Sequence, residues 1–491
     1  MPNTREIILS ILMEYDKSDT RKKSLLKDTL TKYDYLETRD KAFIKRVTDG
    51  CLERNIQIDY VIDSFSKTPV KKMQPFIRSL MRMSVYQIMF MDQVPDSAAC
   101  NEAVKLAAKH KFNGLKGFVN GVLRNISRNK DKIEYPQAQQ NGGVDYLSVV
   151  YSAPEWLCRK WINEYGFEKT RQMLEFFLTA RPTTIRVTGN LSQSSDADTL
   201  AKELSAAGAE VKKNPLLPYA LELEKTDNIM FLPGFAEGKF AVQDVSSMLV
   251  TEIADPQPGQ TVVDVCAAPG GKSMHAAERV GSEGRVISRD VSERKCDLIR
   301  ENAERLGITN IVTQVHDAKI HDESLNETAD ILYLDVPCSG LGILGRKNDI
   351  KLNVKPAGLT ELTHLQWDIV KASWDYVKVG GYLIYSTCTV NRAENEDMVK
   401  RICDELPFER VDITDKLPAA LRECRGILHE ADSTTDKSKE ETTEKITELR
   451  EAESCNCQDT VKDNATIGQI QLIPGEHGTD GFFIAKLRRT N

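Results

Sequence analysis

The chain has no long hydrophobic run. No stretch of its 491 residues approaches the roughly 18 uninterrupted apolar residues of a membrane-spanning helix. The opening residues, Met1 to Glu6, and the polar segment Glu14 to Lys17 also lack the pattern of a signal peptide. Hydrophobic residues make up 41% of the sequence, which is enough for globular folding. We therefore expect a cytoplasmic protein with no membrane partner.

A disulfide framework is absent as well. The 11 cysteines are an odd number and are scattered along a chain without secretory features, which indicates a reducing compartment. Only Cys455 and Cys457 form a close pair, and no second pair or histidine cluster accompanies them. Four ligands are the usual requirement of a structural zinc site, so no metal site is predicted.

Two glycine-rich nucleotide motifs are missing. There is no G-x-G-x-x-G, the loop that binds dinucleotides. Gly271, Lys272 and Ser273 end like a phosphate loop, but that motif needs glycine five positions before Gly271, where this chain has Cys266. These absences disfavour a dinucleotide and a nucleoside triphosphate as ligands.

The first part of the chain is basic and helical in pattern. Residues 1–130 carry 24 Lys or Arg against 15 Asp or Glu, a net charge of +9, which leaves −16 for the rest of a chain whose total is −7. Apolar residues recur at helical spacing, as in Ile7, Ile8, Ile11 and Leu12. The pattern predicts an all-α domain over residues 1–128. Its lysine and arginine clusters suit phosphates, although a solvated helix surface explains such clusters equally well.

Two further domains are expected after a polar linker at 129–146. Residues 147–235 mix a helical segment, Trp161 to Thr179, with strand candidates, which indicates a small α/β module. From 236 to 491 strand and helix patterns alternate, which predicts a mostly parallel, doubly wound sheet. Within it, residues 430–463 hold 11 acidic and 5 basic residues and no aromatic residue, the composition of a disordered insertion.

A small-residue turn follows the first strand candidate of the doubly wound region, Val262 to Val265. The turn consists of Cys266, Ala267, Ala268, Pro269, Gly270, Gly271 and Lys272. Small residues let a backbone approach a ligand closely. Asp290 and Asp317 end or follow the next two strand candidates, where a carboxylate can accept hydrogen bonds from a ribose, although such acids are often helix caps. Together these features favour S-adenosylmethionine as the cofactor.

Two cysteines follow strand candidates directly. Cys338 comes after Ile331 to Leu334 and Cys388 after Tyr382 to Tyr385, so both should emerge at the edge where an open α/β sheet binds ligands. Carbon 5 of a pyrimidine becomes nucleophilic only after a nucleophile adds at carbon 6, and a thiolate suits that addition. Each cysteine alone reads as a small buried residue. The pair beside a methyl-donor site points to covalent catalysis.

Asp335 and Lys272 complete the candidate site. Asp335 precedes Cys338 by three residues and could accept a hydrogen bond from the amino edge of cytosine, and Lys272 could place a charge near the reacting base. The alternatives are a cap for the first and a surface cation for the second.

At this point the sequence resembles a known family, the RsmB (Sun/Fmu) type of bacterial small-subunit ribosomal RNA cytosine-5 methyltransferases. The stretches that carry the resemblance are Phe240 to Ser247, Asp264 to Lys272, Asp335 to Gly340, Asp349 to Lys351, Leu365 to Gln366, Gly380 to Thr389 and Asp480 to Phe483. Residues Val94 to Val104 and Gly117 to Asn125 resemble the NusB RNA-binding fold.

The resemblance implies roles for individual residues. Cys388 corresponds to the nucleophile of the family and Cys338 to the thiol that assists release. Contacts to the methyl donor are implied for Cys266 through Lys272, for Asp290, for Asp317 and for Asp335. Two departures stand out: Gly345 to Asp349 lacks the usual paired arginines and proline, and Leu352 replaces an expected tryptophan.

The sequence thus predicts a multidomain α and α/β protein: an N-terminal all-α NusB-like bundle, a small α/β module and a C-terminal doubly wound, Rossmann-like methyltransferase sheet. The expected activity is methyl transfer from S-adenosylmethionine to carbon 5 of a cytosine in small-subunit (16S) ribosomal RNA. The expected partner is that RNA, free or in an assembling subunit, and the expected state is a monomer. A transfer RNA methyltransferase and a non-catalytic RNA-binding factor are the alternatives.

Overall fold

The computed structural model describes residues 3–17, 25–189, 194–226, 228–423 and 468–491. The acidic insertion predicted at 430–463, with Cys455 and Cys457, lies outside these residues. The chain forms two compact units, one of Met1–Thr179 with Ile343–Gly358 and one of Ala180–Gly342 with Leu359–Asn491. Among the helices of the described ranges, none combines the length and the apolar character needed to cross a membrane.

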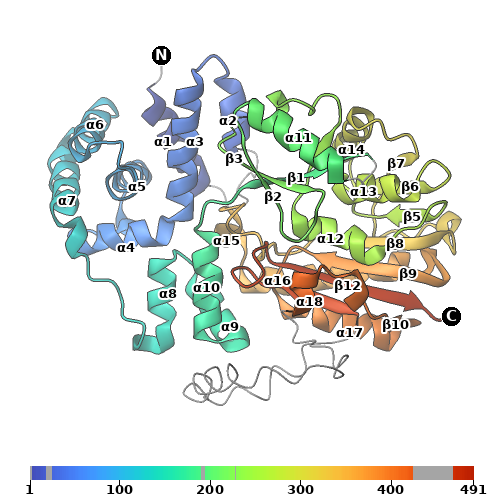
Figure 1. Ribbon diagram of the computed structural model, residues 1–491. Coiled ribbons are helices and arrows are strands. Elements are labelled where there is room, and N and C mark those ends of the chain that lie inside the picture. The colour runs from blue at the N-terminus through green and yellow to red at the C-terminus, as the bar shows by residue number, and fades with distance from the viewer. Residues whose placement is uncertain (1–2, 18–24, 190–193, 227, 424–467) are drawn as a thin grey trace, which may run out of the picture. The chain divides into compact units, whose positions relative to one another are not determined.

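The first unit begins with a helical bundle, drawn in blue to teal in Figure 1. Its helices are α1 (Thr4–Lys17), α2 (Leu25–Lys32), α3 (Thr38–Glu53), α4 (Asn55–Phe65), α5 (Pro75–Phe90), α6 (Asp96–Lys109) and α7 (Lys116–Asn129). Helix α5 has more buried residues than the other helices of the described bundle, eleven in all. It starts with Pro75, which suits the first turn of a helix because that turn has no partner for a backbone N–H.

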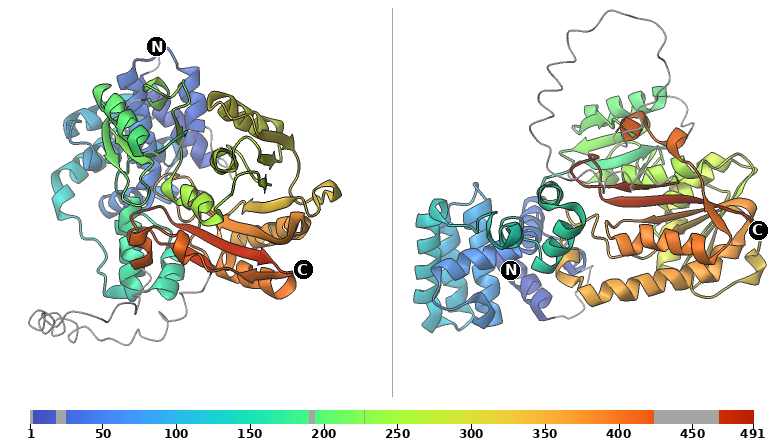
Figure 2. Two further views of the ribbon diagram at one scale, coloured as in Figure 1. Left: turned by 45° about the vertical axis from the view of Figure 1, so that its right-hand side comes forward. Right: turned by 90° about the horizontal axis from the view of Figure 1, so that it is seen from below.

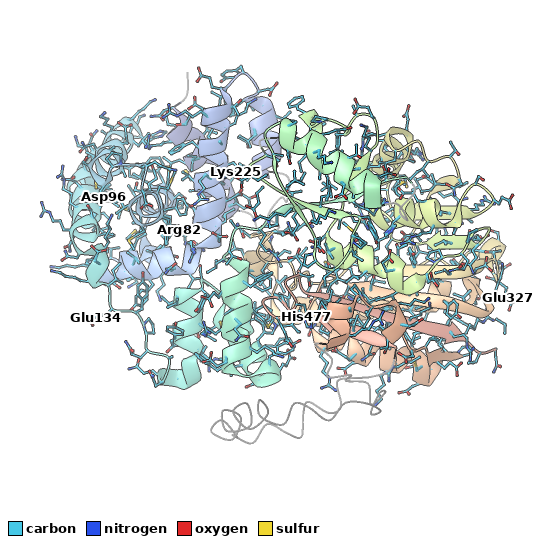
Figure 3. All side chains as sticks on the ribbon, viewed as in Figure 1. Arg82, Asp96, Glu134, Lys225, Glu327 and His477 are labelled. Carbon is cyan, nitrogen blue, oxygen red and sulfur yellow. The ribbon has the colours of Figure 1, made fainter. Side chains whose placement is uncertain are left out.

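An ion-pair network links three helices of this bundle. Arg82 of α5 (Figure 3) donates through Nε and Nη2 to the two carboxylate oxygens of Asp59, both at 2.7 Å, and through Nη1 to Asp16 at 3.0 Å. Asp59 lies on α4 and Asp16 on α1, so one planar guanidinium joins three helices.

The first unit continues through α8 (Val144–Val150), α9 (Glu155–Tyr165) and α10 (Phe167–Phe177), and it takes in α15 (Ile350–Asn353). The helical segment expected over Trp161 to Thr179 consists of the end of α9 and of α10. Gly166 adopts a φ of +79° between α9 and α10, a backbone conformation that glycine tolerates and that interrupts a helix.

The second unit contains a small antiparallel sheet in the order β2-β3-β1-β4. Its strands are β1 (Thr183–Val187), β2 (Glu210–Lys213), β3 (Ala220–Glu224) and β4 (Phe240–Val242), and α11 (Ser194–Ala206) packs on it through Leu200 and Leu204. The fourth strand comes from beyond residue 235, the predicted end of the module. It is short, and only its pairing with β1 makes it a strand. The predicted domain limits at 128, 146 and 235 stay predictions.

The large sheet of the second unit has the order β10-β12-β9-β8-β5-β6-β7, with β11 paired to β12. Its strands are β5 (Thr261–Asp264), β6 (Arg285–Asp290), β7 (Ile311–Val315), β8 (Ala329–Asp335), β9 (Val377–Thr387), β10 (Phe408–Arg410), β11 (Gln469–Leu472) and β12 (Phe482–Arg489). Strands β5 to β9 pair in parallel, and β10 to β12 add an antiparallel edge.

Helices cover both faces of this sheet. Its helices are α12 (Val245–Ala254), α13 (Gly271–Val280), α14 (Glu293–Arg305), α16 (Pro356–Ser373), α17 (Glu396–Glu405) and α18 (Ala419–Glu423). Alternate strand residues face opposite sides, so Val262 packs with α12 and α13 while Val263 packs with α16 and α17. Figure 2 shows α16 along its face of the sheet. The expected fold class, with a helical bundle, a small α/β module and a doubly wound sheet, is confirmed.

Candidate active site

The pairing of β8 with β9 brings the two predicted cysteines together. Asp335 lies opposite Ser386 in this parallel pair, and each strand then runs a few residues further to Cys338 and Cys388. The two Sγ atoms are 3.2 Å apart. A disulfide bond is about 2.05 Å long, so these are two free thiols in contact, and both are partly accessible.

The contact makes the two sulfurs unequal. The hydrogen bond with Cys388 raises the pKa of Cys338 well above its ordinary value, and burial of the side chain and the charge of Glu394 raise it further. The raised pKa favours the protonated form of Cys338, and either sulfur can donate in the contact between them.

Asp335 anchors a second part of the site. Its Oδ2 accepts a hydrogen bond from Lys272 Nζ at 2.6 Å and its Oδ1 accepts one from Ser386 Oγ at 2.8 Å. Burial lowers the pKa of Lys272, but the charge and hydrogen bond of Asp335, with the charges of Asp264 and Cys388, together raise it above its ordinary value, so the ammonium stays charged. Lys272 is the second residue of α13, so this ion pair connects the small-residue turn to the strand that leads to Cys338.

The small-residue turn is tight and rigidly held. Gly270 adopts a φ of +101°, and a Cβ there would meet the side chain of Met274 at 2.9 Å. The N–H of Gly270 donates to the carbonyl of Ala267 at 2.7 Å, and the N–H of Ala267 donates to Arg289 of β6 at 2.9 Å. Cys266 starts this turn, and burial raises the pKa of its thiol, so it is not a reactive thiolate.

Asp290 supports the same turn. Its Oδ2 accepts the N–H of Ala268 at 3.0 Å, and its Oδ1 accepts from the N–H of Val291 at 2.7 Å and from Lys295 Nζ at 2.8 Å. A carboxylate offers about four acceptor positions, so one remains for a further donor. Sequence reasoning expected a ligand contact here, with a helix cap as the alternative, whereas the carboxylate fixes the turn.

Asp264 lies at the base of the turn as the last residue of β5. It is buried, and burial raises its pKa to about 7 even though Ser273 Oγ donates to its Oδ2 at 2.7 Å. Among the described residues, none donates a hydrogen bond to Asp264 Oδ1. An unpartnered buried carboxylate oxygen fits a donor group of a bound molecule.

Asp317 is not joined to these residues by any hydrogen bond within the described ranges. It follows β7, whose Val315 lies opposite Asp290, so it belongs to the same edge of the sheet. Its Oδ1 accepts the N–H of Lys319 at 3.0 Å, which caps a turn.

Sequence reasoning missed Glu394. This fully buried residue ends a short 3-10 helix, Arg392–Glu394, six residues after Cys388, and it accepts hydrogen bonds from Ser339 and Gln366. The local sequence gives no signal for it, because a glutamate in a polar segment reads as a surface residue.

No group of three or more His, Cys, Asp or Glu side chains that could hold a metal ion is found within the described ranges.

Comparison with known proteins places these features in one family. A model described as 16S rRNA methyltransferase RsmB/F matches residues 251–488, a NusB family model matches 2–128, and a ferredoxin-like domain model of RsmF/B-like methyltransferases matches 153–230.

Two curated relatives match over the full length. A probable ribosomal RNA small subunit methyltransferase B from Bacillus subtilis is 34% identical over 99% of both chains, and one from Synechocystis is 31% identical over 100% of both. Among solved structures, the crystal structure of PH0851 covers 99% of both chains with a TM-score of 0.72 at 22% identity, which shows a shared fold. On these grounds the chain belongs to the RsmB family of S-adenosylmethionine-dependent 16S ribosomal RNA methyltransferases, with a NusB domain at its N-terminus.

Proposed function

We propose that this protein methylates carbon 5 of a cytosine in 16S ribosomal RNA through a covalent adduct between Cys388 and carbon 6 of the base. The observation that carries the proposal is the 3.2 Å contact between the sulfurs of Cys388 and Cys338, beside the Lys272–Asp335 ion pair that reaches the donor turn. Methylation of an exocyclic nitrogen or a ribose hydroxyl needs no such thiol pair.

The chemistry of the base explains the need for a thiol. Carbon 5 of cytosine is a poor nucleophile, so it cannot accept a methyl group directly. When the Cys388 sulfur adds to carbon 6, the electron pair of the double bond between carbons 5 and 6 moves to carbon 5, which becomes nucleophilic. The raised pKa of Cys338 favours its protonated form, so we take Cys388 as the candidate thiolate and as the acceptor in the thiol contact.

Release requires the reverse flow of electrons. Carbon 5 must lose its proton after methylation, the double bond then forms again, and the bond between carbon 6 and the Cys388 sulfur breaks. Cys338, whose sulfur lies 3.2 Å from that of Cys388, is the candidate base: its thiol first gives its proton to solvent, and the resulting thiolate then accepts the proton of carbon 5.

Bound S-adenosylmethionine supplies a methyl group on a sulfonium, which a nucleophilic carbon can accept. The turn Cys266 to Lys272 presents small residues to it, and the unpartnered Oδ1 of Asp264 and the remaining acceptor position of Asp290 fit its amino and hydroxyl donors. Asp317 would contact it from the end of β7.

The Lys272–Asp335 pair would position the cytosine and would not place a net positive charge beside it. The ammonium is neutralised by Asp335, so it does not act as an isolated cation beside the substrate. Both Asp335 oxygens already accept one hydrogen bond each, and each has room for another. Asp335 would accept from the amino group of cytosine, while Lys272 and Ser386 hold the carboxylate in place.

RNA contact is assigned to the basic N-terminal domain over residues 1–128, whose net positive charge suits a phosphate backbone. We place the end of this domain at residue 128. We also propose that the protein acts as a monomer and that its substrate is 16S RNA, either free or in an assembling subunit.

Paired cysteine variants test the mechanism. Cys388→Ala should lose methylation of 16S RNA while binding S-adenosylmethionine as the unchanged protein does, because Cys388 contacts the base and not the donor. Cys338→Ala should accumulate a protein–RNA adduct that survives a denaturing gel, because addition proceeds while release becomes slow. Cys403→Ala is the matched control, since Cys403 is a free cysteine on α17.

Bisulfite sequencing of 16S RNA incubated with the protein identifies the product. Protection of one cytosine from conversion is the expected result. Retained activity in Cys388→Ala, or a methyl group recovered on an atom other than carbon 5, would overturn the proposal.

A further inference from the structure

A buried carboxylate lies behind the two cysteine-bearing loops. Glu394 is fully buried, and each of its oxygens accepts two hydrogen bonds. Oε2 accepts from the N–H of Ser339 at 2.8 Å and from Gln366 Nε2 at 2.9 Å. Oε1 accepts from Ser339 Oγ at 2.5 Å and from Asn391 Nδ2 at 2.8 Å. These four neutral donors fill the acceptor positions of the carboxylate.

The donors bracket Cys338 in the chain. Ser339 is the residue after it, and Gln366 donates through the same Nε2 to the carbonyl of Pro337, the residue before it, at 3.0 Å. Glu394 therefore fixes the backbone on both sides of Cys338.

The same network reaches the second thiol. Ser339 Oγ lies 2.7 Å from Thr389 Oγ1, and Thr389 is the residue after Cys388. The hydroxyl of Tyr385, three residues before Cys388, donates to the backbone carbonyl of Glu394 at 2.7 Å. One residue thus contacts both chain segments whose sulfurs meet.

The charge of Glu394 has no cationic partner. Within the described ranges no Lys, Arg or His side chain forms an ion pair with it, so its charge rests on hydrogen bonds from neutral groups. Burying a carboxylate in this way is costly unless every acceptor is satisfied, and replacing it by a neutral amide would place N–H groups against N–H donors.

We infer that Glu394 is a positioning residue for release of the product: with Gln366 it holds Pro337 to Ser339 so that the Cys338 sulfur stays against the Cys388 sulfur. The inference rests on the proposed cysteine mechanism. Glu394 acts through Cys338 and does not contact the base.

The test uses the full chain with Glu394→Gln, and with Glu405→Gln as the matched control on the exposed side of α17. Release of a pre-formed RNA adduct should slow by about 10- to 100-fold in Glu394→Gln, part of the 10²–10⁴-fold that a positioned proton-transfer group contributes. Binding of S-adenosylmethionine should change by less than about 2-fold, because the network makes no contact with the donor turn, and the control should match the unchanged protein. Equal release rates in Glu394→Gln and the control would overturn the inference.

A double variant separates a positioning role from a general loss of structure. If Glu394 acts through Cys338, adding Glu394→Gln to Cys338→Ala should slow release no further, because the two changes remove the same contribution. A further slowing of the kind seen in the single variant would mean that Glu394 acts by another route and would overturn the inference.

If Glu394→Gln does not fold, Ser339→Ala provides a milder test, because it removes only one of the four donors to Glu394. Ser339→Ala should slow release of the adduct by less than about 10-fold and leave the binding of S-adenosylmethionine unchanged. An unchanged release rate would contradict the idea that the hydrogen bonds to Glu394 position Cys338. Failure of Cys338→Ala to trap an adduct would instead refute the release role in the proposed function, so the two failures are distinguishable.

Discussion

Lys351 offers a quantitative prediction for the first unit. It lies on α15 with a side chain that is 8% exposed, and its Nζ donates to the backbone carbonyl of Ser152 at 2.9 Å and to that of Glu53 at the end of α3. It therefore fastens the segment Ile343–Gly358, which starts five residues after Cys338, to the helices of this unit. We predict that Lys351→Met removes a pH-dependent part of the free energy of unfolding.

The sign and size follow from the burial of the amine. Burial lowers the pKa of Lys351 to about 7, against an ordinary value of 10.5. Between these two values the unfolded chain binds more protons than the folded chain, so stability should rise with pH. One proton corresponds to about 1.4 kcal/mol per pH unit, and the interval of about 3.5 pH units sets an upper limit of about 5 kcal/mol. Below pH 7 both states are charged and the slope disappears.

Urea denaturation at pH 7, 8 and 9 measures this contribution. The free energy of unfolding of the unchanged protein minus that of Lys351→Met should increase by about 1.4 kcal/mol per pH unit, because groups other than Lys351 titrate in both proteins and cancel. The variant also leaves two carbonyls without donors, which costs about 1–3 kcal/mol each at every pH, so the slope is diagnostic and the offset is not.

Lys355→Met is the control, since Lys355 is exposed in the same segment, and the slope for Lys351→Met is measured against it. A Lys351→Met difference that is flat within about 0.3 kcal/mol per pH unit, or that falls with pH, would refute a buried neutral amine.

Glycine substitutions with matched controls give two further predictions. A Cβ on Gly50 of α3 would lie 2.0 Å from the ring of Tyr86, so Gly50→Ala should lower the free energy of unfolding by about 1–3 kcal/mol. Gly121→Ala on α7 has open space around it and should raise the free energy of unfolding by up to about 1 kcal/mol. A Cβ on Gly342 would lie 2.0 Å from the backbone carbonyl oxygen of Gly481, which cannot move aside as a side chain can. Gly342→Ala should therefore lower the free energy of unfolding and reduce the methylation rate. Gly358→Ala, in the first turn of α16 with open space around it, should change neither quantity. Denaturation midpoints and methylation rates check both pairs, and equal behaviour within a pair would contradict the packing shown here.

The sheet was predictable where its strands are buried and apolar. The pattern at Val262 to Val265 overlaps the buried strand β5, and Ile331 to Leu334 lies within β8. The short strands β2 and β4 escaped prediction, because pairing with β3 and β1 rather than local pattern makes them strands. The break between α9 and α10 depends on the positive φ of Gly166. The spacing of apolar residues does not predict a backbone angle, so the sequence pattern did not indicate this break.

Much the same division applies to the candidate site. Residues that follow a strand directly, such as Cys338, Cys388 and Asp290, were found because the carboxyl ends of parallel strands form the ligand-binding edge. Glu394 was not found, because its burial comes from packing against α16 and the Cys338 loop, which lie far from it in the sequence.

The sequence by itself determined the family, the strand-turn-helix of the donor turn and the presence of two thiols at strand ends, because these depend on residue types in local order. The tertiary structure decided how those parts meet. The register of β8 against β9 sets the two sulfurs 3.2 Å apart, and the ion pair of Lys272 with Asp335 joins the donor turn to the thiol loop. It also raised the pKa of Cys338, because a pKa depends on hydrogen bonds, burial and neighbouring charges that only folding assembles.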